Sequence, residues 1–205
     1  MSALEIADII GIISFALSGF LIAVHCKLDI LGVFISAFLT AFGGGMTRDV
    51  LADRTPYVFT SNLPLSLVIA TVLIAMLFKL HKITNLAGKW AFVISDAIGL
   101  SSFAITGAII AIESDFNFLS AVMLAFITAV GGGTIRDVLI NRMPFILVSE
   151  FYATVALIIG SVVYILDAFE LRNIFSLIIV FMFGVVLRVL AYYKKWHLPT
   201  LSKEN

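Results

Sequence analysis

The sequence predicts an all-α membrane protein with seven transmembrane helices, arranged as two inverted three-helix repeats and one added helix. Three observations lead to this fold class. Of the 205 residues, 61% are hydrophobic and only 13% are charged, and the mean hydropathy of +1.14 is too high for a soluble domain. The apolar residues gather in seven segments. One unusual string, Gly-Gly-Gly-x-x-Arg-Asp, occurs twice, first at Gly43 and again at Gly131.

Each predicted helix is a mostly apolar segment of about 20 residues, the length that a helix needs to cross a bilayer. Pro56 and Pro144 follow the second and fifth segments, where a helix can end. The predicted helices are residues 5–24, 29–52, 63–80, 91–112, 117–140, 148–166 and 173–193. They form one transmembrane domain made of a first repeat, a second repeat, a seventh helix and a basic tail, at residues 5–80, 91–166, 173–193 and 194–205.

The two repeats are related by a constant offset. Gly131 follows Gly43 by 88 residues, and the same offset relates Asp8 to Asp96 and Arg54 to Arg142. The match therefore extends over three helices and is a duplication. Because three is an odd number of crossings, the second copy enters the membrane from the opposite side. This predicts an inverted repeat about an axis in the membrane plane, with kinked second and fifth helices.

The positions of the basic residues predict how the protein is oriented. Lysine and arginine concentrate in the links that lie inside if the N-terminus is outside, and in the tail. The inner set is Lys27, Lys79, Lys82, Lys89, Arg142, Lys194, Lys195 and Lys203, and the outer set is Arg54 and Arg172. We expect a multi-pass protein of the inner (plasma) membrane with its C-terminus in the cytoplasm.

The basic residues at the C-terminal end also predict contacts with lipid. Lys194 and Lys195 are expected to bind anionic headgroups, and Arg188 is expected to extend toward the headgroups from the seventh helix. The formal net charge is zero, so nothing in the overall charge indicates a nucleic-acid partner.

The glycine triplets Gly43, Gly44 and Gly45 and their repeat Gly131, Gly132 and Gly133 fall near the middle of the second and fifth helices. Each glycine costs a helix about 1 kcal/mol relative to alanine. We expect both helices to unwind there, so that carbonyl oxygens face a water-filled path and can coordinate a dehydrated cation. The alternative is that the glycines let two helices pack closely.

An arginine follows each triplet within the membrane. Arg48 and Arg136 each cost about 2.5–3.5 kcal/mol near a bilayer centre, so neither is expected to face lipid. The adjacent Asp49 and Asp137 point about 100° away on a helix and are not expected to be automatic partners. Each arginine should therefore have a partner on another helix.

Two aspartates in the first and fourth helices are suitable partners. Asp8 is expected at the same side of the membrane as Arg48, and Asp96 at the same side as Arg136. We predict one ion pair at each mouth of the path, where it narrows or gates the passage. The alternative is that the pairs only hold the helix bundle together.

The first and fourth helices also carry a weakly polar stripe at helical spacing. Its hydroxyls are expected to supply further oxygen ligands if the stripe faces the glycine triplets, and otherwise it is a packing surface. The hydroxyl residues proposed for the path are Ser14, Ser18, Ser102 and Thr106.

No motif of a known enzyme class is evident. The three histidines, His25, His81 and His197, are too scattered for a metal site, and no nucleophile or zinc motif is present. Asp8 and Asp96 are expected at opposite faces, which argues against an intramembrane aspartyl protease. We expect no enzymatic activity, cofactor or resident metal.

The doubled Gly-Gly-Gly-x-x-Arg-Asp motif on a chain of three, three and one helices resembles the prokaryotic branch of the trimeric intracellular cation (TRIC) channel family. The resemblance covers residues 5 to about 193. It implies a homotrimer with one pore per protomer for potassium and also sodium, between the repeats and past the kinked helices. The matching positions are Gly43, Gly44, Gly45, Arg48, Asp49, Gly131, Gly132, Gly133, Arg136 and Asp137.

Two other functions stay open at this point. A secondary carrier of a small amino acid such as glycine shares inverted repeats and broken helices with channels, so fold does not separate the two. A lipid-binding scaffold is a more distant alternative. The short chain and the lack of an embedded acid free of an arginine, which a proton relay would need, favour a channel.

Overall fold

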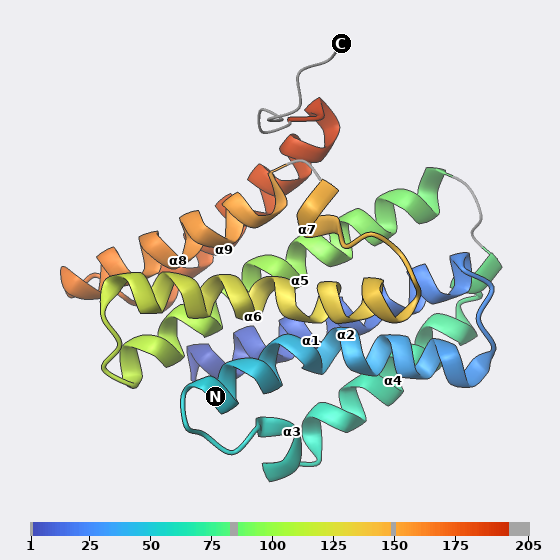
Figure 1. The fold of residues 1–205 in the computed structure, drawn as a ribbon, viewed down its shortest axis with the longest axis horizontal. Helices are drawn as coiled ribbons and strands as arrows, with labels where there is room; N and C mark the ends of the chain where they lie inside the picture. Colours follow the sequence, from blue (N-terminus) through green and yellow to red (C-terminus); the bar gives the residue numbers. More distant parts are fainter. Residues whose placement is uncertain (1, 83–85, 149–150, 197–205) are drawn as a thin grey trace.

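The computed structural model describes residues 2–82, 86–148 and 151–196, which form helices and contain no strand (Figure 1). The longer helices are α1 Ala3–His25, α2 Ile30–Leu51, α4 Leu63–Leu77, α5 Leu86–Glu113, α6 Phe118–Leu139, α8 Tyr152–Ala168 and α9 Ile174–Lys194. The short ones are α3 Tyr57–Thr60, α7 Phe145–Val148 and a 3-10 turn at Leu80–Lys82.

Within the described residues, five helices are long and apolar enough to cross a membrane: α1, α2, α5 from Lys89, α6 and α9. The prediction of an all-helical membrane protein is confirmed. Helices α4 and α8, with 15 and 17 residues, are shorter, so the count of seven spans stays a prediction. Helix α8 begins at Tyr152 rather than at the predicted residue 148, because the short α7 precedes it.

Several helix ends repeat along the chain with the same offset of 88 residues. Asp29 caps α2 by accepting a hydrogen bond from Gly32 N at 2.7 Å, and Asn117 caps α6 by accepting one from Ser120 N at 3.0 Å. These side chains satisfy backbone donors that the first helical turn leaves open. The bounds of α2 and α6, and those of α3 and α7, also differ by 88 residues.

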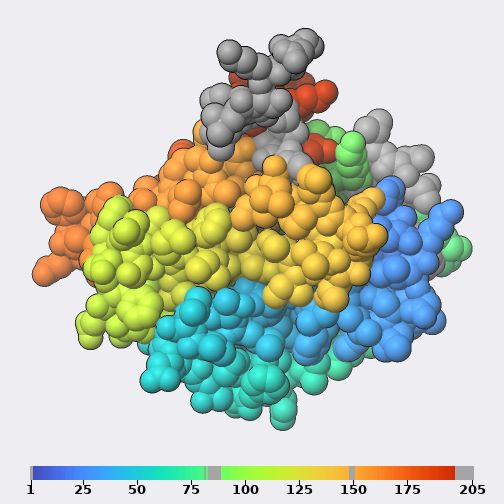
Figure 2. Space-filling view, in the orientation of Figure 1, coloured from blue at the N-terminus to red at the C-terminus, as the bar shows by residue number. Residues whose placement is uncertain are grey.

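Four helices form the centre of the molecule. Helix α1 packs against α5, and α2 packs against α6 (Figure 1). The partners in each pair run in opposite directions (Figure 1). Figure 2 shows α2 and α6 side by side across one face. Helix α4 packs on α1 and α2, whereas α8 packs on α5 and α6, and α9 packs on α5 and α8.

The crossing of α1 and α5 is built from reciprocal contacts between the repeats. The rings of Phe15 and Phe103 meet edge to face, with centroids 5.2 Å apart. A Cβ atom at Gly99 would lie 2.3 Å from the Phe15 ring, and one at Gly11 would lie 2.3 Å from the Phe103 ring. Each ring therefore occupies space that a glycine on the opposite repeat leaves open.

The glycine triplets do not interrupt their helices. Both α2 and α6 are continuous through them, so the prediction that the helices unwind there is wrong. A Cβ atom at Gly44 would lie 2.0 Å from the carbonyl oxygen of Thr128, and one at Gly132 would lie 2.0 Å from that of Thr40. The triplets let the two backbones touch where α2 and α6 cross, which is the packing alternative. A kink without a break stays a prediction.

Candidate functional site

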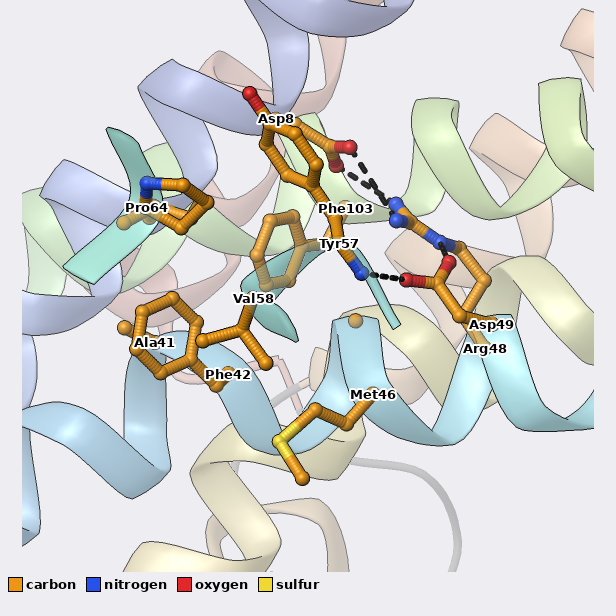
Figure 3. A pocket seen from close by; sticks show the side chains of 12 residues that line it. Asp8, Ala41, Phe42, Met46, Arg48, Asp49, Tyr57, Val58, Pro64 and Phe103 are labelled. Carbon is orange, nitrogen blue, oxygen red and sulfur yellow. Dashed lines mark hydrogen bonds and ion pairs between the residues drawn. The ribbon is translucent and has the colours of Figure 1, made fainter. Parts of the chain in front are cut away.

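The first polar site, here called the Arg48 cluster, consists of Asp8, Arg48 and Asp49, which Figure 3 shows, together with Thr106. Arg48 donates from Nη1 to Asp8 Oδ1 at 2.7 Å and from Nη2 to Asp8 Oδ2 at 3.2 Å, which is a bidentate pair. Its Nη1 also donates to Thr106 Oγ1 at 2.9 Å, and its Nε donates to Asp49 Oδ1 at 2.8 Å. Residues from α1, α2 and α5 therefore meet at one guanidinium group.

The second site, here called the Arg136 cluster, consists of Ser18, Asp96, Arg136 and Asp137. Arg136 donates from Nη1 to Asp96 Oδ1 at 3.1 Å and to Ser18 Oγ at 2.8 Å, and from Nε to Asp137 Oδ1 at 2.8 Å. Ser18 in turn donates to Asp96 Oδ1 at 3.0 Å. The predicted pairs Asp8–Arg48 and Asp96–Arg136 are both present, whereas their position at the mouths of a path stays a prediction.

The adjacent aspartates are also partners, contrary to the sequence-based expectation. A long arginine side chain can fold back along its helix, so that Nε reaches the neighbouring carboxylate despite the angle between the two Cβ directions. The second oxygen of each carboxylate accepts from a backbone amide after the helix end, Tyr57 N at 2.9 Å for Asp49 and Phe145 N at 3.0 Å for Asp137. Each aspartate thus anchors the short helix that follows, α3 or α7.

The two clusters share their helices in a reciprocal way. Helix α1 supplies Asp8 to one cluster and Ser18 to the other, and α5 supplies Asp96 and Thr106 in the reverse order. Each pair is ten residues apart on its helix, which separates the clusters by about 15 Å at 1.5 Å per residue. Ser18 and Thr106 therefore bind the arginines of the opposite repeats, rather than facing opened glycine carbonyls as predicted.

The clusters are buried and carry a negative formal charge. Arg48 is 2% exposed and Arg136 is fully buried. With the carboxylates ionised, one guanidinium and two carboxylates give each cluster a net charge of −1. A buried charge is tolerated only when partners and hydrogen bonds compensate its lost hydration. An excess acid at each arginine lowers the electrostatic energy of a cation nearby.

A narrow cavity lies beside the Arg48 cluster (Figure 3). Its volume open to the centre of a water molecule is about 20 Å³, which is room for about one water. Asp8, Arg48 and Asp49 form its charged wall, and mostly apolar residues of α1, α2, α3, α4 and α5 form the rest. These are Ile12, Ala41, Phe42, Gly45, Met46, Tyr57, Val58, Pro64 and Phe103.

Only some of the predicted path residues lie at the clusters. An added Cβ atom at Gly45 would lie 4.0 Å from Arg48 Nη2, and one at Gly133 would lie 3.6 Å from Arg136 Nη2. The other four triplet glycines lie at the α2–α6 crossing: Gly43, Gly44, Gly131 and Gly132. Ser14 and Ser102 are buried, and among the described residues Ser102 Oγ has no hydrogen-bond partner.

The C-terminal basic residues divide into exposed and buried ones. Lys194 and Lys195 are exposed at the end of α9, where lipid binding stays a prediction. The described residues end at 196, so most of the predicted tail, 194–205, lies outside them. Arg188 is 3% exposed and lies over the ring of Tyr152, with its Cζ atom 4.9 Å from the ring centroid. The prediction that it extends to the headgroups is wrong, because aromatic rings of the protein surround it.

The comparisons with known proteins agree with this architecture. The family model described as Glycine transporter matches residues 5–80 and again residues 93–168. UPF0126 membrane protein YvgT of Bacillus subtilis is 38% identical over 98% of this chain and 97% of its own length. UPF0126 inner membrane protein YadS of Escherichia coli K12 is 41% identical over 77% of this chain and 75% of its own length.

Solved structures give the family its name. A prokaryotic TRIC channel solved in 0.5 M KCl is 36% identical, has a TM-score of 0.86 and covers 95% of this chain and 98% of its own. The chain belongs to the TRIC family. The Glycine transporter family is this same TRIC family.

Two further TRIC structures show the same likeness. One, solved to explain conductance through TRIC cation channels, is 38% identical with a TM-score of 0.84 and covers 98% of both chains. The TRIC orthologue from Rhodobacter sphaeroides is 28% identical with a TM-score of 0.87, and covers 95% of this chain and all of its own.

The sequence reasoning missed the aromatic residues around the Arg136 cluster. The ring of Phe92 lies 5.1 Å from Arg136 Cζ, and Tyr152 is buried beside Gly133, which also contacts the guanidinium group. A comparison of the repeats position by position would have indicated them, because Leu4 and Pro64 stand at the corresponding places.

Proposed function

We propose that this protein is a cation channel that assembles as a homotrimer in the plasma membrane, with one conduction path in each protomer. The observation that carries the proposal is the 38% identity and TM-score of 0.84 to a TRIC cation channel over 98% of both chains. The proposed cargo is potassium and also sodium. The proposed topology has seven spans, an outer N-terminus and a cytoplasmic C-terminus.

The charge of the two clusters supports a cation as the cargo. The Arg48 cluster has one more carboxylate than guanidinium, whereas at the Arg136 cluster the buried Arg188 brings a second guanidinium group over the Tyr152 ring. Both clusters lie on helices that are long and apolar enough to cross a membrane. A buried negative charge attracts a permeating cation and repels an anion, more strongly than it would in bulk water. The positive charge of the arginines weakens this attraction for the cation. Weak binding is needed because a permeating ion must leave the site as well as enter it.

The proposed path runs between the repeats and passes both arginine clusters, with Gly45 and Gly133 facing it. The cavity beside Arg48 has room for about one water. Between the clusters, Phe15 and Phe103 close the α1–α5 crossing. We therefore assign this conformation to a closed channel, in which the inner surfaces of the two repeats are in contact. Opening requires these surfaces to separate and hydrate.

Recording from the purified protein in planar bilayers tests the proposal. With a KCl gradient, we expect discrete current steps that reverse close to the potassium equilibrium potential. Replacing potassium with sodium should retain the steps. The matched control is the Gly132→Leu protein from the same preparation, since its side chain would collide with Thr40 O at the α2–α6 crossing. Steps in this control would indicate a contaminant.

A flux assay separates the channel from a carrier. The same protein is reconstituted into liposomes and supplied with labelled glycine or with rubidium as a potassium substitute. A channel gives rubidium uptake and no saturable glycine uptake. Silent bilayers combined with saturable glycine uptake would overturn the proposal in favour of a small amino-acid carrier.

A further inference from the structure

We infer that Tyr152 is a plug that closes the proposed path at the Arg136 cluster, and that Arg188 of α9 holds this plug in place. The inference rests on the proposed channel function and names the residue that blocks one half of the path. Its starting point is a difference between two repeats that otherwise make matching contacts.

The first step is the comparison of corresponding positions. Tyr152 lies 88 residues after Pro64, and Pro64 lines the cavity beside Arg48. In the second repeat the same position carries a phenol ring, which is 2% exposed. The Tyr152 hydroxyl lies 3.3 Å from the place of a Cβ atom at Gly133. The tyrosine therefore occupies, beside Arg136, the space that corresponds to the cavity at Arg48.

A second aromatic ring encloses Arg136 from another side. Phe92 lies over the guanidinium group at 5.1 Å, and its counterpart in the first repeat is the smaller Leu4. Arg136 is fully buried, whereas Arg48 borders the cavity. The repeats differ at these two positions, where the second has Phe92 and Tyr152 in place of Leu4 and Pro64. As a result the Arg136 cluster is enclosed by rings, whereas the Arg48 cluster borders a small cavity.

The added helix α9 supplies the contact that holds the tyrosine. Arg188 lies over the Tyr152 ring at 4.9 Å and over the Tyr192 ring at 6.0 Å, and it is buried. A guanidinium group and the aromatic face beneath it attract each other, and this cation–π attraction is strongest where water is excluded. Helix α9 packs on α5 and α8 of the second repeat. This gives α9, which has no counterpart in the first repeat, a specific role at the second cluster.

The plugged arrangement leaves buried polar atoms without hydrogen bonds. Among the described residues, Arg136 Nη2 has no hydrogen-bond partner, and the Tyr152 hydroxyl lies near the Asp96 carboxylate but makes no hydrogen bond of normal geometry. Arg48 Nη2, by contrast, donates to Asp8. Buried polar groups without partners destabilise the state that contains them. Water entering after the ring moves would satisfy both atoms, so hydration offsets part of the cost of opening.

The backbone before the plug is also strained. Phe151 has φ of 52°, in the left-handed region that a bulky side chain rarely adopts. Strain of this kind is held in place by the surrounding packing and often occurs where a segment changes conformation. Movement of the start of α8 would release this strain and withdraw the Tyr152 ring from Arg136.

The test compares variants at position 152 in bilayers and by thiol labelling. Tyr152→Ala removes the ring and should raise the single-channel open probability. Tyr152→Phe keeps the ring and should leave the open probability low, because the ring rather than the hydroxyl blocks the path. Pro64→Tyr should fill the cavity at Arg48 and reduce the current. Tyr164→Ala, on the same helix and against Phe118, is the matched control and should behave as the unmodified protein.

Labelling measures hydration of the site without requiring conduction. The reporter is Ser18→Cys in a Cys26→Ser background, because Ser18 Oγ lies 2.8 Å from Arg136 Nη1. A minor open state is commonly populated at about 0.1–10%, so making it dominant should speed labelling by a membrane-impermeant thiol reagent about tenfold or more. Size-exclusion chromatography with the reporter protein as reference shows whether each variant is folded.

The outcomes distinguish the plug from the channel proposal. Faster labelling and higher open probability in Tyr152→Ala alone support the plug. Equal labelling and equal currents in a folded Tyr152→Ala protein overturn it and leave the channel intact. If no variant conducts ions, the channel proposal fails. If, in that case, Tyr152→Ala is also labelled at the same rate as the reporter protein, Tyr152 is not a barrier to water and the plug is overturned too.

Discussion

At the scale of single residues, the buried arginines contribute more to the free energy of unfolding than the exposed ion pairs do. Arg48 has side-chain hydrogen bonds to two carboxylates and a threonine, and its side chain is 3% exposed. The pair between Arg54 and Glu113, at 3.2 Å, has side chains 36% and 40% exposed. Water screens the second pair and competes for its hydrogen bonds, whereas removal of Arg48 leaves two buried carboxylates without their cation.

This contrast predicts the effect of two matched substitutions on stability. Arg48→Gln should cost about 3–5 kcal/mol, which corresponds to a fall in melting temperature of about 10 °C for a chain of this size. Arg54→Gln should cost less than about 1 kcal/mol. Thermal unfolding in detergent, followed by circular dichroism, measures both. Equal losses in the two variants would show that the Arg48 cluster contributes no more than a surface pair.

At the scale of helices, the glycine triplets determine how closely α2 and α6 approach. The three glycines of one triplet differ sharply in their surroundings. A Cβ atom at Gly44 would lie 2.0 Å from a backbone carbonyl oxygen of α6, whereas one at Gly45 would meet only Arg48 Nη2, at 4.0 Å. A backbone atom cannot move aside as a flexible side chain can, so the two positions should differ in their tolerance of alanine.

Alanine substitutions along one triplet test this view of the crossing. Gly44→Ala should force the helices apart and lower the melting temperature strongly, and Gly132→Ala should do the same from the other side. Gly45→Ala should be neutral or slightly stabilising, since alanine is the better helix former. Fluorescence-detected size exclusion after heating gives the three values. A Gly44→Ala protein as stable as Gly45→Ala would contradict the close crossing.

At the scale of the whole molecule, two similar halves have become unequal. The repeats match in the bounds and caps of α2 and α6, in their ion pairs and in their crossing glycines. In the described residues, the second repeat differs by carrying Tyr152 and by packing against α9 through α5 and α8. In the proposed channel, halves that run in opposite directions give a path with similar chemistry at both ends. The unequal residues make one end of this proposed path differ from the other.

The proposed inversion predicts that corresponding turns lie on opposite sides of the membrane. Cys26 lies in the turn after α1, and Ser114 lies 88 residues later in the turn after α5. In intact cells, an impermeant thiol reagent should label Ser114→Cys in a Cys26→Ser background. The natural Cys26 should react only after the membrane is permeabilised. Labelling of both positions from the same side would rule out the inverted arrangement.

Much of the site could be predicted from the sequence, because the spacing of the repeated residues indicates which positions correspond. The offset of 88 residues predicted which positions correspond, and the cost of a lone arginine in a membrane predicted the partners Asp8 and Asp96. The roles of Asp49 and Asp137 were not predicted, because the angle between Cβ atoms does not describe the reach of a long, flexible side chain.

By itself the sequence determined that the protein is helical, belongs in a membrane and consists of two related halves with paired charges, since composition and period carry this information. Only the tertiary structure decided that the glycine triplets remain helical and that Tyr152 and Arg188 enclose one cluster. A glycine can break a helix or admit a close neighbour, and a tyrosine can face lipid or fill a cavity. Which of these occurs depends on the helix that packs against it, and one segment of sequence does not specify that helix.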